Sequence, residues 1–263
     1  MTRLELIGGG RMGEALLGGL LAAGWATPDE LAVVEPVAAR RAELADRYPG
    51  LVVLDAPVAA EGVVIAVKPG QVADVARSLG PLAVGRVLSI AAGVTIGQIE
   101  AALGGDVPVV RAMPNTPALV GCGASAIAGG THATDADLDW AHGVLEAVGI
   151  VVRVSEPQLD AVTGLSGSGP AYVFLVAESL IEAGVLVGLP RDVSTALAVQ
   201  TLLGSARLLA ETDDDAPTLR AAVTSPGGTT AAGLRALEDR ATRAAFIAAV
   251  SAARDRSAEL AAD

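Results

Sequence analysis

The chain has 263 residues and a formal net charge of −12, which excludes the basic surface that nucleic-acid-binding proteins need. Its single cysteine, Cys122, excludes an intramolecular disulfide. Hydrophobic residues make up 52% of the chain but aromatic residues only 2%, so the core is predicted to consist of Ala, Val and Leu. Apolar runs reach about half a membrane span or less. The start, Met1-Thr2-Arg3, lacks a basic segment before a cleavable apolar stretch. We therefore expect a soluble, cytoplasmic protein that binds neither membrane nor nucleic acid.

Short runs rich in Val and Ile alternate with helical stretches up to about residue 153. Continuous apolar runs of this kind are typical of strands buried on both faces of a parallel sheet. The predicted strands are Leu4–Ile7, Leu31–Val34, Leu51–Leu54, Val63–Val67, Val87–Ile90 and Val107–Val110. The predicted helices between them are Met12–Ala23, Val37–Tyr48 and Gln71–Leu79. This alternation predicts an α/β domain with a doubly wound, Rossmann-type parallel sheet.

The strand pattern ends at Ser155, and Ala- and Leu-rich helices follow. The predicted helices are Ala171–Leu186, Ser194–Ala210, Thr230–Leu237 and Ala241–Leu260. Gly- and Pro-containing segments separate them. We therefore predict two domains, residues 1–153 with the sheet and residues 154–263 with helices only. The long helices of the second domain are candidates for a dimerisation surface.

A glycine motif follows the first predicted strand and opens the first predicted helix. The segment Gly8-Gly9-Gly10-Arg11-Met12-Gly13 fits G-x-G-x-x-G, the pattern of a dinucleotide-binding loop. In that loop the first glycine allows a tight turn, the second lets the backbone approach a pyrophosphate, and the third allows close helix–strand packing. The alternative is a glycine-rich turn without a ligand. The strand–loop–helix context favours a dinucleotide.

Charged residues at two further strand ends bear on the cofactor. Glu35 ends the second strand, where an acid bonds the ribose 2′-hydroxyl of NAD and repels the 2′-phosphate of NADP. Arg40 and Arg41 follow and could instead grip a phosphate, or lie on an exposed helix face. Lys68 closes the fourth strand, at the edge where such sheets bind ligands. A solvated strand-end charge is the alternative for Glu35 and Lys68, so these residues leave the choice of cofactor open.

Two glycine- and hydroxyl-rich segments precede helices in the second half, at residues 160–170 and 224–230. Successive backbone N–H groups at a helix start form a cradle for an anion. Thr229 or Thr230 could alternatively be a plain N-cap. Both roles are compatible, because they use different atoms of one turn.

The chain lacks the motifs of zinc proteases and serine hydrolases. The two histidines, His132 and His142, form no H-E-x-x-H motif, and no G-x-S-x-G elbow surrounds Ser166 or Ser168. We therefore predict no metal site and no serine-hydrolase triad. Cys122, between two glycines, is interpreted as a small packed residue rather than a nucleophile.

Six segments resemble the pyrroline-5-carboxylate reductase family, collinearly from about residue 4 to residue 260. They are Ile7–Gly13, Ala66–Pro69, Ser89–Val94, Arg111-Ala112-Met113-Pro114-Asn115-Thr116-Pro117, Asp160–Tyr172 and Ser225–Thr230. The resemblance implies an oxidoreductase of proline biosynthesis that reduces 1-pyrroline-5-carboxylate to L-proline, usually with NADPH. It implies homodimers that interleave through the C-terminal helices, often five dimers in a decamer.

The resemblance also implies residue roles. The dinucleotide would be held by Gly8, Gly9, Gly10, Arg11, Met12, Gly13, Glu35, Pro36, Ala66, Val67, Lys68, Pro69, Ala91 and Ala92. The substrate would be bound by Glu156, Ser225, Gly227, Gly228, Thr229 and Thr230, with the backbone N–H groups of residues 227–229 on its carboxylate. Glu35 departs from the family, where many members carry Ser or Asn-Arg that suit a 2′-phosphate. NADPH is therefore expected as the cofactor, with NADH possible. Ala222 also departs, since some relatives have a polar residue there.

Hydride transfer to an imine needs alignment and a hydrogen-bond partner at the imine nitrogen. Thr230 is the first candidate for that partner and Thr163 the second, with Lys68 as a further catalytic candidate. Two alternatives stay open. A dehydrogenase of similar plan acting on a 3-hydroxy acid normally uses a catalytic lysine on a helix, but no lysine follows Lys68. A non-enzymatic dinucleotide-binding oligomer would need the glycine loop but not residues 225–230.

Overall fold

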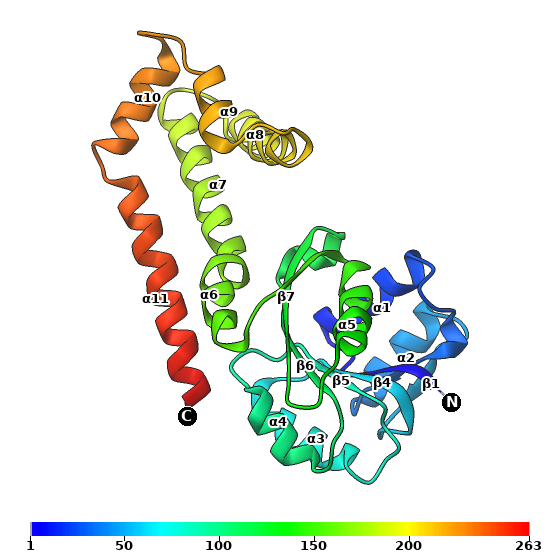
Figure 1. Ribbon diagram of the computed structural model, residues 1–263. Helices are drawn as coiled ribbons and strands as arrows, with labels where there is room; N and C mark the ends of the chain where they lie inside the picture. Colours follow the sequence, from blue (N-terminus) through cyan, green and yellow to red (C-terminus); the bar gives the residue numbers. More distant parts are fainter. Residues whose placement is uncertain (1, 263) are drawn as a thin grey trace. The chain divides into compact units, whose positions relative to one another are not determined.

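In the computed structural model, which describes residues 2–262, strands and helices alternate as far as Arg153 and only helices follow (Figure 1). The chain forms two compact units. One comprises the residues up to Ser168 together with the segment from Ser251 onward, and the other comprises Gly169–Val250. The predicted boundary after residue 153 falls where the last strand ends, whereas the compact units divide fifteen residues later, after Ser168.

The first unit contains one eight-stranded sheet in the order β3-β2-β1-β4-β5-β6-β7-β8. Its strands are β1 (Thr2–Ile7), β2 (Leu31–Val34), β3 (Val52–Leu54), β4 (Ala60–Ile65), β5 (Val87–Ser89), β6 (Val109–Met113), β7 (Gly123–Gly129) and β8 (Gly149–Arg153). All neighbouring strands are parallel except β6 and β7, which are antiparallel. The order reverses at β1, from which the chain runs outward first through β2 and β3 and then through β4. That reversal is where such sheets bind ligands.

Helices cover both faces of this sheet. They are α1 (Arg11–Ala22), α2 (Ala38–Arg47), α3 (Val72–Leu79), α4 (Ile96–Leu103), α5 (Asp135–Glu146) and the short α6 (Leu159–Val162). Leu4 and Leu6 of β1 share a buried cluster with α1, α2 and α5. Ile7 of the same strand belongs to a second cluster with α3 and α4. Because side chains alternate along a strand, β1 supplies both cores. The predicted doubly wound α/β architecture is confirmed.

Two strands and three helices of this unit, including the short α6, lie beyond those predicted. Strand β7 has the sequence Gly-Ala-Ser-Ala-Ile-Ala-Gly, which lacks a run of β-branched residues although Ala126 and Ile127 are fully buried. Its antiparallel pairing with β6 makes the sheet mixed rather than purely parallel. Strand β8 and helices α4 and α5 were likewise not predicted. Strand β6 begins two residues later than expected and runs to Met113.

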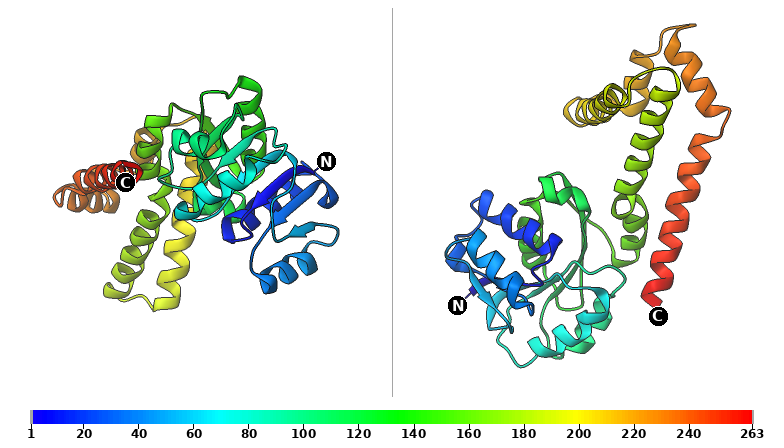
Figure 2. Two further views of the ribbon diagram at one scale, coloured as in Figure 1. Left: turned by 90° about the horizontal axis from the view of Figure 1, so that it is seen from below. Right: turned by 180° about the vertical axis from the view of Figure 1, so that it is seen from behind.

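The second unit is helical throughout the described residues. It contains α7 (Gly169–Leu186), α8 (Arg191–Glu211), α9 (Ala216–Ala222), α10 (Thr229–Glu238) and the first part of α11 (Thr242–Ala262). Figure 2 shows α7 and α8 as two long helices joined by a short turn. The Ser194 hydroxyl ties the pair by donating to the Ile181 carbonyl at 2.7 Å. The four helices predicted for this region are confirmed, and α9 is an additional one.

The helices of the second unit bury almost none of their apolar side chains within one chain. Helix α7 has no buried residue, and α8 buries only Ser194 and Ala198. The exposed apolar side chains include Val173, Phe174, Leu175, Leu180, Leu186, Leu197, Val199, Leu203, Leu208 and Leu209. An apolar surface of this extent is typical of a protein–protein or membrane contact.

Two helical stretches are long and apolar enough to cross a membrane. They are Glu156–Leu186 and Arg191–Glu211, with mean hydropathies of 1.4 and 1.3. Glycines and charged residues interrupt both stretches, so neither is an uninterrupted apolar run. Long helices that pack between subunits of a soluble protein have the same composition, so this finding alone is weak support for a membrane span.

Candidate active site

The glycine loop between β1 and α1 has a conformation that only glycine satisfies at two positions. Gly8 has φ of +113°, and a Cβ there would lie 2.6 Å from the Ala66 carbonyl oxygen. A Cβ on Gly13 would collide with the carbonyl oxygen of Gly8. Gly10 is different, because a Cβ there would meet no atom within 4 Å. Packing thus explains Gly8 and Gly13, whereas the open space at Gly10 is what a ligand approaching the backbone requires.

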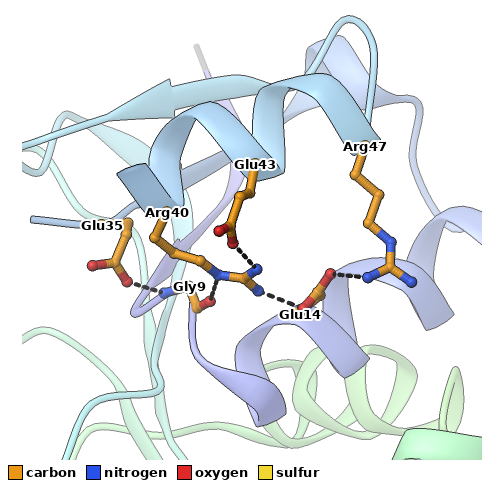
Figure 3. A network of polar contacts seen from close by, with 6 residues as sticks. All are labelled: Gly9, Glu14, Glu35, Arg40, Glu43 and Arg47. Carbon is orange, nitrogen blue, oxygen red and sulfur yellow. Dashed lines mark hydrogen bonds and ion pairs between the residues drawn. The ribbon is translucent and has the colours of Figure 1, made fainter. Parts of the chain in front are cut away.

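Glu35 is directed at this loop (Figure 3). Its side chain lies at the end of β2 and is largely buried. One carboxylate oxygen accepts from the Gly9 N–H at 3.1 Å, and the other accepts from the Val37 N–H at 2.9 Å. The sequence leaves a ribose contact and a solvated charge open for Glu35. The structure gives Glu35 a further role, because it braces the loop that would carry the pyrophosphate.

Arg40 and Arg41 also hold backbone in this region. Arg40 Nε donates to the Gly9 carbonyl at 2.9 Å, and its guanidinium forms ion pairs with Glu14 and Glu43 (Figure 3). Arg41 donates to the carbonyl oxygens of Glu35 and Pro36, both at 2.8 Å. Both guanidiniums therefore have a structural role. This role differs from the two predicted alternatives, a phosphate contact and an exposed helix face.

A cavity of about 570 Å³ lies beside the glycine loop at the carboxyl ends of the central strands. It is lined by Ile7, Gly8, Gly10, Val34, Glu35, Pro36, Asp55, Pro57, Ala66, Val67, Lys68, Gln71, Asp74, Val75 and Ser78. We call it the loop cavity. It brings together three separate segments that the sequence assigned to the cofactor. Its charged lining consists of three carboxylates and Lys68.

Some residues predicted to hold the cofactor lie outside this cavity. Met12 packs against the buried cluster of α1, and Ala91 is buried in the cluster of α3 and α4. Arg11 lines another cavity of about 510 Å³ along one face of α1, together with Glu14 and Arg47. Gly9 and Gly13 are buried behind the loop surface.

Glu5 holds the segment that forms one wall of the loop cavity. This residue of β1 is fully buried, and its Oε1 accepts from the Val58 N–H at 3.0 Å. The segment it holds carries Asp55 and Pro57, which line the cavity. Glu5 Oε2 is buried without a hydrogen-bond partner among the described residues. Burial raises the pKa of the Glu5 carboxyl, and the bond from Val58 only partly opposes this.

A second cavity has a volume of about 400 Å³. It is lined by Pro69, Ala92, Gly93, Thr163, Ser168, Ala253, Arg256, Ser257 and Leu260. We call it the inner cavity. Lys68 lines the first cavity and Pro69 the second, so one turn of chain after β4 borders both. The inner cavity thus places Thr163, a catalytic candidate, beside Pro69 and Ala92, two cofactor candidates.

Thr163 begins a π-helical turn, Thr163–Gly167, between α6 and α7. Such turns occur frequently at functional sites. The Thr163 hydroxyl donates to the Leu159 carbonyl at 2.8 Å, which leaves its oxygen able to accept a hydrogen bond. Asn115 holds the turn by donating to the Ser166 carbonyl at 3.1 Å and accepting from the Ala124 N–H. The sequence gives no sign of this role of Asn115, because its two partners lie 51 and 9 positions away.

Glu156 makes contacts that give it a structural function. Its Oε1 accepts from the Ile96 N–H at 2.7 Å, at the start of α4, and from Arg111 at 3.1 Å. Arg111 is 6% exposed and Glu156 30% exposed. A carboxylate at a helix N-terminus paired with a buried guanidinium stabilises both groups. A substrate contact by Glu156 stays a prediction.

The predicted anion cradle lies in the second unit, before α10. Gly227 has φ of +68°, and Gly228 is the N-cap of the helix without a side-chain cap. The first backbone N–H groups of a helix have no intrahelical acceptor, so those of Thr229 and Thr230 can meet an anion. The turn is closed by the Gly228 N–H, which donates to Ser225 at 3.0 Å. Substrate binding by Ser225, Gly227 and Gly228 also stays a prediction.

Cys122 is exposed, in contrast to the expectation of a packed residue. It follows Gly121, which has φ of +72° and ends the short helix Thr116–Val120. The turn directs the chain toward β7 along the surface of the unit.

Two family models match the chain. The model described as pyrroline-5-carboxylate reductase dimerisation matches residues 156–260. The model described as NADP oxidoreductase coenzyme F420-dependent matches residues 3–93. The first covers the helical part, and the second covers the glycine loop and the segment after β4.

Relatives match along the whole chain. The pyrroline-5-carboxylate reductase of Mycobacterium tuberculosis is 46% identical over 99% of this chain and 97% of its own. The solved structure of the Coxiella burnetii enzyme has a TM-score of 0.93 at 36% identity and covers 98% of both chains. That of the Plasmodium falciparum enzyme, solved with NADP bound, has a TM-score of 0.86 at 32% identity, over 99% of this chain and 98% of its own. With likeness of this extent in sequence and fold, the chain belongs to the pyrroline-5-carboxylate reductase family.

Proposed function

We propose that this protein reduces 1-pyrroline-5-carboxylate to L-proline with NADPH, and also with NADH, in the last step of proline biosynthesis. The observation that carries the proposal is the shared border of the two cavities at Lys68 and Pro69. A dinucleotide whose adenosine half lies in the loop cavity would extend toward Thr163 in the inner cavity. Membership of the family supplies the substrate class.

The residues of this chain would hold the cofactor by its phosphates. Gly10 leaves room for the pyrophosphate at the N-terminus of α1, where the helix dipole favours an anion. Ala66, Val67 and Lys68 form the facing wall. A nicotinamide cofactor held in this way would supply the hydride for the imine carbon.

A threonine hydroxyl acts on the imine nitrogen. Protonation makes the imine carbon electrophilic, and the N–H so formed needs an acceptor that holds the ring in place. Thr230 is the proposed partner, and Thr163 is the second candidate. A hydride from the reduced cofactor and a proton from solvent would together convert C=N into CH–NH, which leaves L-proline and the oxidised cofactor. The carboxylate lies in the cradle of Ser225, Gly227, Gly228 and Thr229, which adds no net positive charge.

The active form is a homodimer through the C-terminal helices. The proposal is supported by the many exposed apolar side chains of α7 and α8, which a second copy of the chain would cover. The dimerisation model over residues 156–260 supports the same contact. Five such dimers would make the decamer that the family resemblance implies. A cytoplasmic location is consistent with this function.

The assay that tests the proposal is NADPH and NADH oxidation with racemic 1-pyrroline-5-carboxylate. We expect turnover with both cofactors and L-proline as product. Oxidation of a 3-hydroxy acid by NADP⁺ or NAD⁺ is the matched control for a dehydrogenase of similar plan. Cofactor binding without turnover of either substrate would contradict the enzymatic assignment and favour a dinucleotide-binding oligomer.

Cofactor preference is expected to depend on Glu35. Glu35→Ser removes a carboxylate from the cavity wall and should raise the ratio of kcat/KM for NADPH to that for NADH by about tenfold or more. Two like charges 4 Å apart repel by about 4 kcal/mol at an effective dielectric constant near 20, and a tenfold ratio needs only about 1.4 kcal/mol.

Glu35 also braces Gly9 and Val37, so the serine variant loses two hydrogen bonds besides a charge. Glu35→Gln is the matched variant, because it removes the charge and retains an acceptor oxygen. Both variants should shift the ratio in the same direction. An unchanged ratio in Glu35→Gln would show that the carboxylate does not face the 2′-position of the cofactor.

A further inference from the structure

Strand β1 places a carboxyl group at the centre of the sheet. Glu5 is fully buried, and it pairs with Ala32 of β2 and with Val63 of β4. The residues on either side of it, Leu4 and Leu6, are apolar and also fully buried. Burying a carboxyl group costs free energy that an apolar residue at the same position does not. The stability of the sheet therefore does not account for an acid at this position.

The contact between Glu5 and Val58 accounts for the acid instead. Residues 55–58 connect β3 to β4 and belong to neither a helix nor a strand. Among the described residues, the single hydrogen bond of this segment is the one that the Val58 N–H donates to Glu5 Oε1 at 3.0 Å. Asp55 and Pro57 of the same segment line the loop cavity. The carboxyl group of Glu5 thus ties this wall of the cavity to the sheet.

The other walls of the loop cavity are held by backbone bonds. The Gly8 N–H donates to the Val34 carbonyl at 2.9 Å, and the Ala66 N–H donates to the Ile7 carbonyl at 2.8 Å. Both bonds continue the ladders of the sheet into the loops that follow it. Ile7 lines the cavity and lies on the same face of β1 as Glu5, two residues earlier. The wall of residues 55–58 therefore differs from the others, because its hydrogen bond comes from a buried side chain.

We propose that Glu5 is a positioning residue for the cofactor, because it holds Asp55 and Pro57 in place against the adenosine half of the dinucleotide. The proposal rests on the proposed reductase function, in which that half occupies the loop cavity. A wall that is already ordered loses less conformational entropy when a ligand binds, which strengthens binding. Glu5 does not touch the reacting atoms. It should therefore affect the dissociation constant of NADPH and leave kcat at saturating cofactor nearly unchanged.

Calorimetric titration of the full-length protein with NADPH tests this role. Glu5→Leu removes the acceptor and should raise the dissociation constant about two- to tenfold, the range expected for the loss of one hydrogen bond. Glu5→Gln keeps an acceptor oxygen and should bind NADPH like the wild type. In steady-state kinetics of Glu5→Leu, KM for NADPH should rise with the dissociation constant while kcat stays nearly unchanged.

A thermal melt separates cofactor positioning from a general effect on the fold. Glu5 Oε2 is buried without a hydrogen-bond partner among the described residues, and leucine removes that oxygen. Val58 is exposed, so water can accept from the N–H that the substitution releases. Glu5→Leu should therefore melt at or above the temperature of the wild type while it binds NADPH more weakly. A lower melting temperature together with weaker binding would indicate a role in stability alone and contradict the proposal.

Val58→Pro tests the same contact from its exposed end, because proline lacks the N–H and the substitution leaves the buried strand unchanged. It should weaken NADPH binding as Glu5→Leu does, and the double variant should bind no more weakly than either single variant. Glu61→Gln is the matched control for net charge, since Glu61 is exposed on β4 and does not line the loop cavity. It should bind NADPH normally. Additive losses in the double variant, or wild-type affinity in Glu5→Leu, would overturn the proposal.

Titration with ADP-ribose, which lacks the nicotinamide, distinguishes this proposal from the reductase function. Glu5→Leu should weaken the binding of ADP-ribose by the same factor as that of NADPH. A wild-type protein that shows this Glu5-dependent binding but no turnover of 1-pyrroline-5-carboxylate would retain the positioning role and contradict the reductase function. Turnover with equal affinity for ADP-ribose in the wild type and Glu5→Leu would do the reverse.

Discussion

Gly10→Val is expected to leave the fold intact and to lower NADPH affinity by at least about a hundredfold. Gly10 has φ of −73° and ψ of −174°, which valine adopts readily, and a Cβ there meets no protein atom within 4 Å. The fold therefore loses only the difference between glycine and valine as an N-cap, about 1 kcal/mol. The valine side chain instead fills the space that the pyrophosphate needs. Overpacking costs about 1–3 kcal/mol, and displaced phosphate contacts add to that.

Fluorescence titration of NADPH and a thermal melt measure the two parts of this prediction. Gly97→Val is the matched control, because Gly97 in α4 is also open to a Cβ and is exposed but lines neither cavity. It should bind NADPH normally. Gly8 and Gly13 are unsuitable for the test, since a Cβ at either position meets backbone and would disturb the loop. Normal affinity in a folded Gly10→Val protein would exclude this loop as the dinucleotide site.

Thr230→Ala is expected to lower kcat/KM for 1-pyrroline-5-carboxylate about ten- to hundredfold. A lost hydrogen bond to a charged group is worth about 1.5–3 kcal/mol, and each 1.36 kcal/mol is about tenfold in rate. Thr230 is the second residue of α10, where alanine is compatible with the helix. Cofactor affinity should barely change, because the loop cavity is built from other segments.

Two further variants make the test of Thr230 specific. Thr230→Ser restores the hydroxyl and should recover most of the activity. Thr229→Ala removes the neighbouring hydroxyl but keeps the backbone N–H proposed for the carboxylate, so it should have little effect. If Thr230→Ala turned over like the wild type, Thr163 would become the partner to test. If neither threonine mattered, the site would act by alignment alone.

Local patterns were sufficient to predict the parts of the fold that bury long apolar runs. The strands β1, β2 and β4 are rich in Leu, Val and Ile, and each was predicted within a few residues. Strand β7 escaped prediction because Ile127 is its single β-branched residue and the others are Ala, Gly and Ser. Its antiparallel direction depends on pairing with β6, which no local pattern specifies.

The residues of the candidate site likewise fall into those that the local sequence predicts and those that only the fold brings to the site. Spacing alone indicated Gly8, Gly10 and Gly13, and the geometry gives each a separate physical reason. By contrast, Glu35 braces a loop 26 positions earlier, and Ser257 bonds to Asp160 across 97 positions. Arg256 lies in a sequence of alternating charges that is typical of an exposed helix face. Only the three-dimensional structure places it beside Thr163 in a cavity.

The buried carboxyl of Glu5 couples folding to proton uptake. Its pKa is raised by burial above the ordinary value of about 4.3. At a pH between the ordinary pKa of the unfolded chain and the raised pKa of the folded protein, the folded protein holds a proton on Glu5 that the unfolded chain has released. The contribution of Glu5 to the free energy of unfolding is therefore largest below the ordinary value and declines as pH rises through the raised value. Glu5→Gln should remove that decline, which denaturant unfolding across the same pH range would measure. The wall of the loop cavity that Glu5 holds through Val58 is thus linked to the acidity of the medium.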